Sequence, residues 1–167
     1  MTESGRVTID PALDDLVAKF LARTLPKAQW THLAHLRVGA WHVDRFGTYE
    51  AIERLRRGIR ALNDVHGTRN DDRSGYHETI TIAYVRLLAV FLAASRASTF
   101  EERTRELLTG PLADKDFLLR FWSRDVLFSA SARAAWVAPD RPAAGCATTA
   151  QDEDGSADEA LVAALQG

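Results

Sequence analysis

The chain has 167 residues, 46% of them hydrophobic and 26% charged, with a formal net charge of −2, as is typical of one soluble globular domain. Its single cysteine, Cys146, excludes an intramolecular disulfide and a zinc site built on cysteines. The longest apolar run, residues 87–94, is too short to span a bilayer, and the polar start of the chain has no apolar segment of a secretory signal. We therefore expect a cytoplasmic protein without a membrane partner.

The charges are unevenly distributed. Residues 150–167 hold five acidic side chains and no lysine or arginine. Four arginines cluster within residues 54–60, a pattern typical of a solvated helix face. No concentrated basic patch is present, so the sequence gives no indication of nucleic-acid binding.

The first half of the chain predicts three helices. Asp10 and Pro11 provide an N-cap and a first helical residue for the first of them. A second helix is expected over residues 28–46, ending at Gly47 as a C′ residue, and a third follows as far as Gly67.

The middle of the chain predicts a surface loop and two more helices. Residues 67–75 are polar and bounded by glycines, as in a loop. The apolar stretch 76–97 opens with β-branched residues, but its length favours a helix over a strand, and its apolar character on most sides favours a central position. Thr99 and Glu102 have the spacing of a capping box, which starts a helix ending at Gly110.

The last part of the chain predicts two short helices, capped by Asp114 and by Ser123, with the second reaching Val137. We expect an all-α, single-domain bundle of about five to seven helices without a sheet, spanning residues 8–142. The composition of residues 143–167 predicts a flexible, acidic C-terminal tail.

Three of the five histidines lie in two segments that predict a metal site. His32 and His35 are three residues apart and therefore share one face of a helix. His77 begins the most apolar helix, directly after the polar loop. Imidazole is the commonest protein ligand for transition metals, so we expect these three side chains to bind one divalent metal ion. Zinc is the simplest choice, with iron or copper as alternatives.

Glu78 has several interpretations. It suits a fourth ligand, an acceptor for the N–H of a ligating histidine, or a general base acting on a metal-bound water. With two histidines it would give the arrangement that binds iron(II). The alternative is an acidic residue in the first turn of a helix, where it interacts with the helix dipole. The sequence lacks the H-E-x-x-H pattern of zinc proteases and the paired Glu-x-x-His motifs of di-iron bundles.

The leading functional hypothesis is a mononuclear metal-dependent enzyme acting on a small polar metabolite. Zinc would favour hydrolysis or elimination, and iron or copper would favour oxygen chemistry. The alternative is a non-catalytic helical protein that binds a ligand or a partner, with structural histidines. A homodimer is left open. Candidate substrate-binding residues are aromatic or cationic: Tyr76, Tyr84, Trp122, Arg124 and Arg133.

Two resemblances extend this interpretation. Segments 30–36, 75–81 and 123–133, continued by Trp136, Pro139 and Asp140, resemble motifs of an uncharacterised family of short bacterial proteins. This resemblance spans roughly residues 15–142 and implies a folded unit of that extent, without an activity. The chain is also distantly similar to DinB-like bundles, which hold a metal through three histidines. It departs from them because it has no late H-x-x-x-H segment after His77.

Overall fold

The computed structural model describes residues 11–141, which form a bundle of six α-helices and three 3₁₀ helices, with no strand in that range. The elements are α1 (Pro11–Leu21), η1 (Lys27–Gln29), α2 (His32–Val65), α3 (Glu78–Ala94), α4 (Phe100–Thr109), η2 (Pro111–Ala113), η3 (Phe117–Arg120), α5 (Arg124–Leu127) and α6 (Ala130–Ala134). The expected all-α fold is confirmed. The predicted cap Asp10 and the tail lie outside the described residues, in which no helix has the length and hydropathy needed to cross a membrane.

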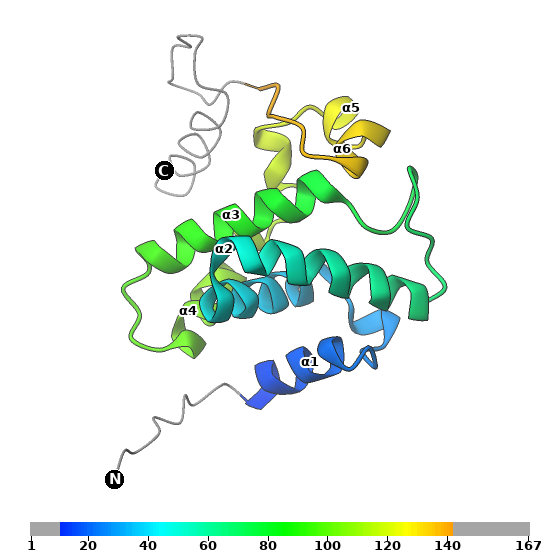
Figure 1. The fold of residues 1–167 in the computed structure, drawn as a ribbon. Helices are drawn as coiled ribbons and strands as arrows, with labels where there is room; N and C mark the ends of the chain where they lie inside the picture. The colour runs from blue at the N-terminus through cyan, green and yellow to red at the C-terminus, as the bar shows by residue number, and fades with distance from the viewer. Residues whose placement is uncertain (1–10, 142–167) are drawn as a thin grey trace.

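Helix α2 consists of two arms joined at Gly47. This glycine has φ +74°, a left-handed conformation that interrupts the helix, as expected from the sequence. Figure 1 shows the chain reversing at this cyan end, so that the two arms form a helical hairpin. The first arm begins at His32 and not at residue 28, because Thr31 caps it by accepting a hydrogen bond from the backbone N–H of Ala34 (3.3 Å).

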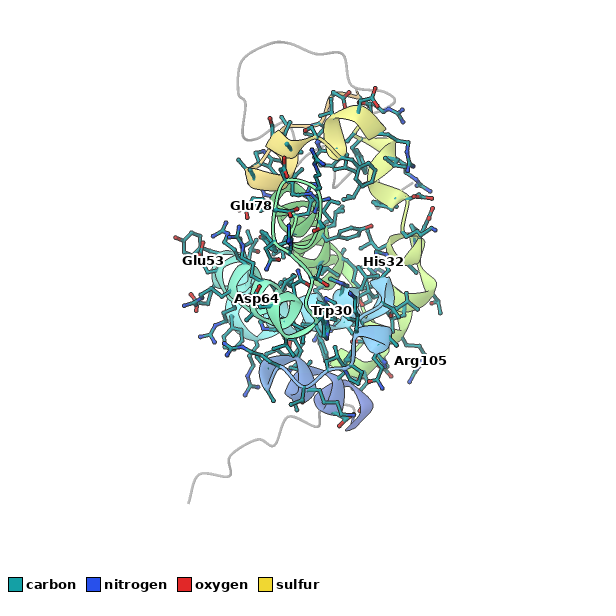
Figure 2. The ribbon with its side chains drawn as sticks, turned by 90° about the vertical axis from the view of Figure 1, so that its right-hand side faces the viewer. Trp30, His32, Glu53, Asp64, Glu78 and Arg105 are labelled. Carbon is teal, nitrogen blue, oxygen red and sulfur yellow. The ribbon has the colours of Figure 1, made fainter. Side chains whose placement is uncertain are left out.

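The helices are arranged in layers, with α1 on one side of the α2 hairpin, α3 on the other, and α5 and α6 beyond α3 (Figures 1 and 2). Helix α3 is the apolar central helix that the sequence predicts. It begins at Glu78, two residues later than expected, because His77 has an extended backbone and acts as its N-cap. Its buried face packs against α2, and together they form most of the core.

The chain after α3 divides into short elements. The capping box is confirmed, with Thr99 and Glu102 each bonding the backbone N–H of the other at 3.2 Å. Ser123 caps α5 as predicted. The single helix from Ser123 to Val137 is wrong, because Ser129 accepts a hydrogen bond from the N–H of Ala132 (3.1 Å) and so starts a second helix, α6.

Asp114 does not start a helix either. It follows η2, and its carboxylate accepts a hydrogen bond from the backbone N–H of Asp116 (3.0 Å), after which η3 begins. The chain between Gly110 and Ser123 therefore turns repeatedly across the side of the α2–α3 layer instead of forming one longer helix. These turns complete the cavity described next.

Candidate ligand-binding cavity

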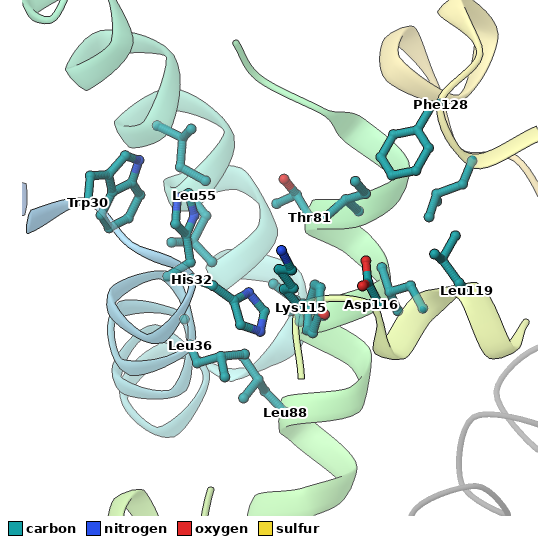
Figure 3. Close-up of a pocket in the computed structure, with 18 residues that line it drawn as sticks. Trp30, His32, Leu36, Leu55, Thr81, Leu88, Lys115, Asp116, Leu119 and Phe128 are labelled. Atoms are coloured by element: carbon teal, nitrogen blue, oxygen red, sulfur yellow. The ribbon is translucent and has the colours of Figure 1, made fainter. Parts of the chain in front are cut away.

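A cavity of about 360 Å³ lies between α2, α3 and the segment of short helices that follows α4 (Figure 3). Leu36 of the first α2 arm, Leu55 of the second and Leu88 of α3 contribute to its walls. Leu119 and Phe128 close it from the C-terminal segment. Its size and mostly apolar lining, with a few polar groups, are those of a small-molecule site.

His35 lines this cavity and is the most available imidazole of the described residues. Its ring lies against the ring of Trp30, tilted by 31°, with 3.7 Å between the ring centroids. Neither ring nitrogen has a hydrogen-bond partner within residues 11–141. Protein atoms surround the side chain, but it faces the cavity and therefore keeps solvent-accessible surface. Desolvation, followed by the proximity of His32, lowers the pKa of His35 to about 3. His35 is therefore neutral at physiological pH.

His32 lies beside His35 at the same cavity, as the three-residue spacing predicts. Its Nε2 is 3.0 Å from the backbone carbonyl oxygen of Leu112. A carbonyl only accepts hydrogen bonds, so Nε2 carries a proton, and in the neutral ring Nδ1 is left as an acceptor. The His32 ring also meets the ring of Tyr84 edge-on, with 5.3 Å between the centroids.

Tyr84 is the one predicted substrate-binding residue that lines the cavity. Its hydroxyl group is buried and has no hydrogen-bond partner among the described residues. Burial, with further contributions from the carboxylates of Asp114 and Asp116, raises the pKa of this hydroxyl. A buried hydroxyl without a partner costs about 1–3 kcal/mol, so this group calls for a ligand or a water molecule as its partner.

His77 lies outside the cavity lining, and both of its ring nitrogens are engaged. Nδ1 accepts a hydrogen bond from the backbone N–H of Ile80 (3.3 Å), and Nε2 donates to the carbonyl oxygen of Leu127 (2.8 Å). Burial, followed by the charge of Arg133, lowers the pKa of His77 to about 4, which keeps the ring neutral. In this arrangement His77 has no free lone pair for a metal ion. It caps α3, and its hydrogen bond to Leu127 links the start of α3 to a residue of the cavity wall.

Glu78 is likewise held by its neighbours, away from the cavity. Arg56 donates to both of its carboxylate oxygens, one of them through Nε at 3.1 Å, and the Tyr76 hydroxyl donates at 2.8 Å. Burial by itself would raise the pKa of Glu78, but the hydrogen bonds from Arg56 and Tyr76 outweigh it and lower the pKa. Glu78 is thus an ionised, hydrogen-bonded carboxylate in the first turn of a helix. This matches its interpretation as an acidic residue that interacts with the helix dipole.

Of the other predicted substrate-binding residues, Tyr76 is buried with its hydroxyl bonded to Glu78, and the remaining three hold the C-terminal segment in place or lie at the surface. Arg133 donates to the carbonyl oxygens of Gly75 (3.2 Å) and Tyr76 (3.3 Å). Trp122 is fully buried, and its indole N–H donates to the carbonyl oxygen of Val137 (3.0 Å). Arg124 is exposed, with its guanidinium 5.3 Å from the centre of the Phe128 ring.

The described residues bring two of the three proposed metal ligands together at the cavity and leave the third elsewhere. Within residues 11–141, no group of three or more His, Cys, Asp or Glu side chains has a geometry that could hold a metal ion. A metal at His32 and His35 would need its further ligands from water or from a bound molecule. The metal site remains a prediction.

Sequence reasoning missed three features of this region. Lys115 and Asp116 at the cavity had no distinguishing pattern, because only the fold brings them beside α3. Arg56 belongs to the arginine cluster of residues 54–60, whose pattern predicts a solvated helix face, but its side chain pairs with Glu78. The N-cap role of His77 was detectable in principle, since it precedes a long apolar helix with a first-turn glutamate.

Comparisons of this chain with protein families, with curated proteins and with solved structures found no match.

Proposed function

We propose that this protein binds a small, largely apolar organic molecule in the cavity between α2, α3 and the C-terminal short helices. The observation that carries this proposal is an accessible, neutral and unpartnered imidazole, His35, at a mostly apolar cavity of about 360 Å³. The apolar walls supply the binding free energy through burial of the ligand surface, and the few polar groups orient the ligand.

A cavity-filling substitution tests this function. Val85 is buried and lines the cavity, so Val85→Phe places a larger side chain in the space that a ligand would occupy. Val65→Phe is the matched control, because Val65 is 62% exposed near the end of α2 and does not line the cavity. The probe is N-phenyl-1-naphthylamine, a neutral dye that becomes fluorescent in apolar sites.

We expect saturable fluorescence enhancement with the wild-type protein and the control, and at least about tenfold weaker binding by Val85→Phe, which corresponds to about 1.4 kcal/mol. A thermal melt checks that the variant is folded, and Leu119→Trp provides a second way to fill the cavity if it is not. Absence of saturable binding by the wild-type protein, or equal binding by all variants, would contradict the proposal.

A metal-dependent enzyme is a second candidate, favoured by the adjacent imidazoles of His32 and His35. The ion would activate water or polarise an oxygen atom of the bound molecule. Elemental analysis of protein purified without a metal-binding tag tests it. About one zinc or iron per chain, lost in His35→Ala and retained in the control His66→Ala, would support an enzyme. Protein without metal, whose melting temperature no divalent ion raises, would reject it.

A further inference from the structure

The polar groups at one side of the cavity define the chemistry of its ligand. They are the Nδ1 atom of His32 and the hydroxyl of Tyr84, whose rings are in edge contact with 5.3 Å between the centroids. Neither group has a hydrogen-bond partner among residues 11–141, whereas the other nitrogen of His32 donates to the Leu112 carbonyl. From the juxtaposition of this acceptor and this hydroxyl we infer that the ligand is a neutral alcohol or phenol whose hydroxyl group bonds both.

The hydrogen-bond pattern selects a hydroxyl group. In the neutral ring, His32 Nδ1 only accepts, because Nε2 holds the proton and uses it on a carbonyl oxygen. Tyr84 has a free O–H to donate. The matching ligand group must donate to His32 and accept from Tyr84, which one hydroxyl does. An ether or a ketone satisfies only Tyr84, and a hydrocarbon satisfies neither.

The charges around the cavity select a neutral molecule over an anion. Apart from the histidines, the ionisable side chains with a full charge at the cavity are Lys115 and Asp116, which are adjacent, exposed and opposite in sign. Asp114, also exposed, adds a second negative charge near Tyr84. An anion would lose its hydration without gaining a compensating partner.

This inference rests on the proposed function. Three probes with the same ring system, 2-naphthol, naphthalene and 2-naphthoate, test the ligand class separately from the binding function. Their affinities are measured by displacement of N-phenyl-1-naphthylamine at pH 7. We expect 2-naphthol to bind about tenfold more tightly than naphthalene, as a net gain of about 1.4 kcal/mol from two hydrogen bonds would give. We expect 2-naphthoate to bind most weakly of the three.

The decisive variant is Tyr84→Phe, which removes only the hydroxyl group. It should reduce the preference for 2-naphthol over naphthalene to about threefold or less while leaving naphthalene affinity unchanged. Tyr49→Phe is the matched control, because Tyr49 is 79% exposed and does not line the cavity, and it should keep the full preference.

The outcomes separate the two proposals. If naphthalene and 2-naphthol displace the dye equally well, or if 2-naphthoate binds most tightly, the inference about the ligand class is overturned while the binding function stands. A preference that survives Tyr84→Phe also overturns it. If the dye itself does not bind, both proposals fail together with the cavity site.

Discussion

The two histidine-bearing segments, residues 30–36 and 75–79, differ in whether their polar atoms are already paired. In segment 75–79 the His77 ring, the Glu78 carboxylate and the Thr79 hydroxyl all have hydrogen-bond partners within the protein. In segment 30–36 the His35 ring has no such partner among the described residues and faces the cavity. Paired groups contribute to stability, whereas unpaired accessible groups are available to a ligand.

Segment 75–79 connects the start of α3 to the C-terminal elements. His77 bonds the carbonyl of Leu127, and Arg133 bonds the carbonyl of Gly75. The Thr79 hydroxyl donates to the carbonyl of Ala135 (2.8 Å) and accepts from the N–H of Val137 (3.0 Å). This segment therefore holds the wall of the cavity in place without contacting a ligand. Substitutions and a change of pH should reveal these separate roles of the two segments.

His77→Ala should lower the free energy of unfolding by about 3 kcal/mol, because it removes the N-cap of α3 and leaves the buried carbonyl of Leu127 unpaired. His77→Asn, which retains a capping side chain, should lose about 1 kcal/mol less. Urea titration followed by circular dichroism measures both. A loss below about 1 kcal/mol for His77→Ala would show that segment 75–79 does not stabilise the fold as described.

Arg56→Met should lower the free energy of unfolding by about 2 kcal/mol, because it leaves the buried Glu78 carboxylate without its cation. The exposed pair of Glu50 and Arg54 provides a control, and Arg54→Met should cost less than about 0.5 kcal/mol. The same urea titration compares the two variants at pH 7. Equal losses in the free energy of unfolding would show that the pair of Arg56 and Glu78 stabilises the fold no more than the exposed pair of Arg54 and Glu50.

Acidification should destabilise the protein through His77. Its pKa in the folded state, about 4, lies below the 6.5 of the unfolded chain, so the unfolded state binds more protons between these values. This contribution is fully present above about pH 6.5 and is lost as the pH falls toward 4. Between pH 7 and pH 5 it amounts to about 2 kcal/mol. Urea titrations at both pH values should show at least this loss in the wild-type protein, because the lowered pKa of His35 adds to it, and a loss smaller by about 2 kcal/mol in His77→Asn. An unchanged pH dependence in the variant would assign the titration to other groups.

His35→Ala should affect stability less than His77→Ala or Arg56→Met, with a loss of at most about 1 kcal/mol from its ring contact with Trp30, since it makes no hydrogen bond among the described residues. The same substitution should weaken dye binding, because it removes ring surface from the cavity wall and an imidazole that can accept a hydrogen bond from the amine N–H of the dye. A stability loss as large as that of His77→Ala would mean that the two segments do not differ in role.

Helical periodicity and end signals predicted most of the secondary structure. Gly47 ends the first α2 arm, and the capping box at Thr99 starts α4, because both effects depend on the conformation of a few neighbouring residues. The chain after Gly110 was harder to predict. There Ser129 interrupts the helical pattern that runs from Ser123 to Val137. A serine can cap a new helix or lie within one, and tertiary contacts of the following residues decide between the two.

Residue patterns alone predict an all-α chain and place His32 and His35 on one helix face, because these properties follow from local backbone geometry. The packing of distant segments is what makes this face border a cavity and what pairs the nitrogens of His77 within the protein. The partners of His77 and Glu78 include Leu127 and Arg56, which are 50 and 22 positions away. Hydrogen-bond pairing over such separations has no signature in residue spacing, and it is this pairing that separates a structural histidine from a ligand-binding one.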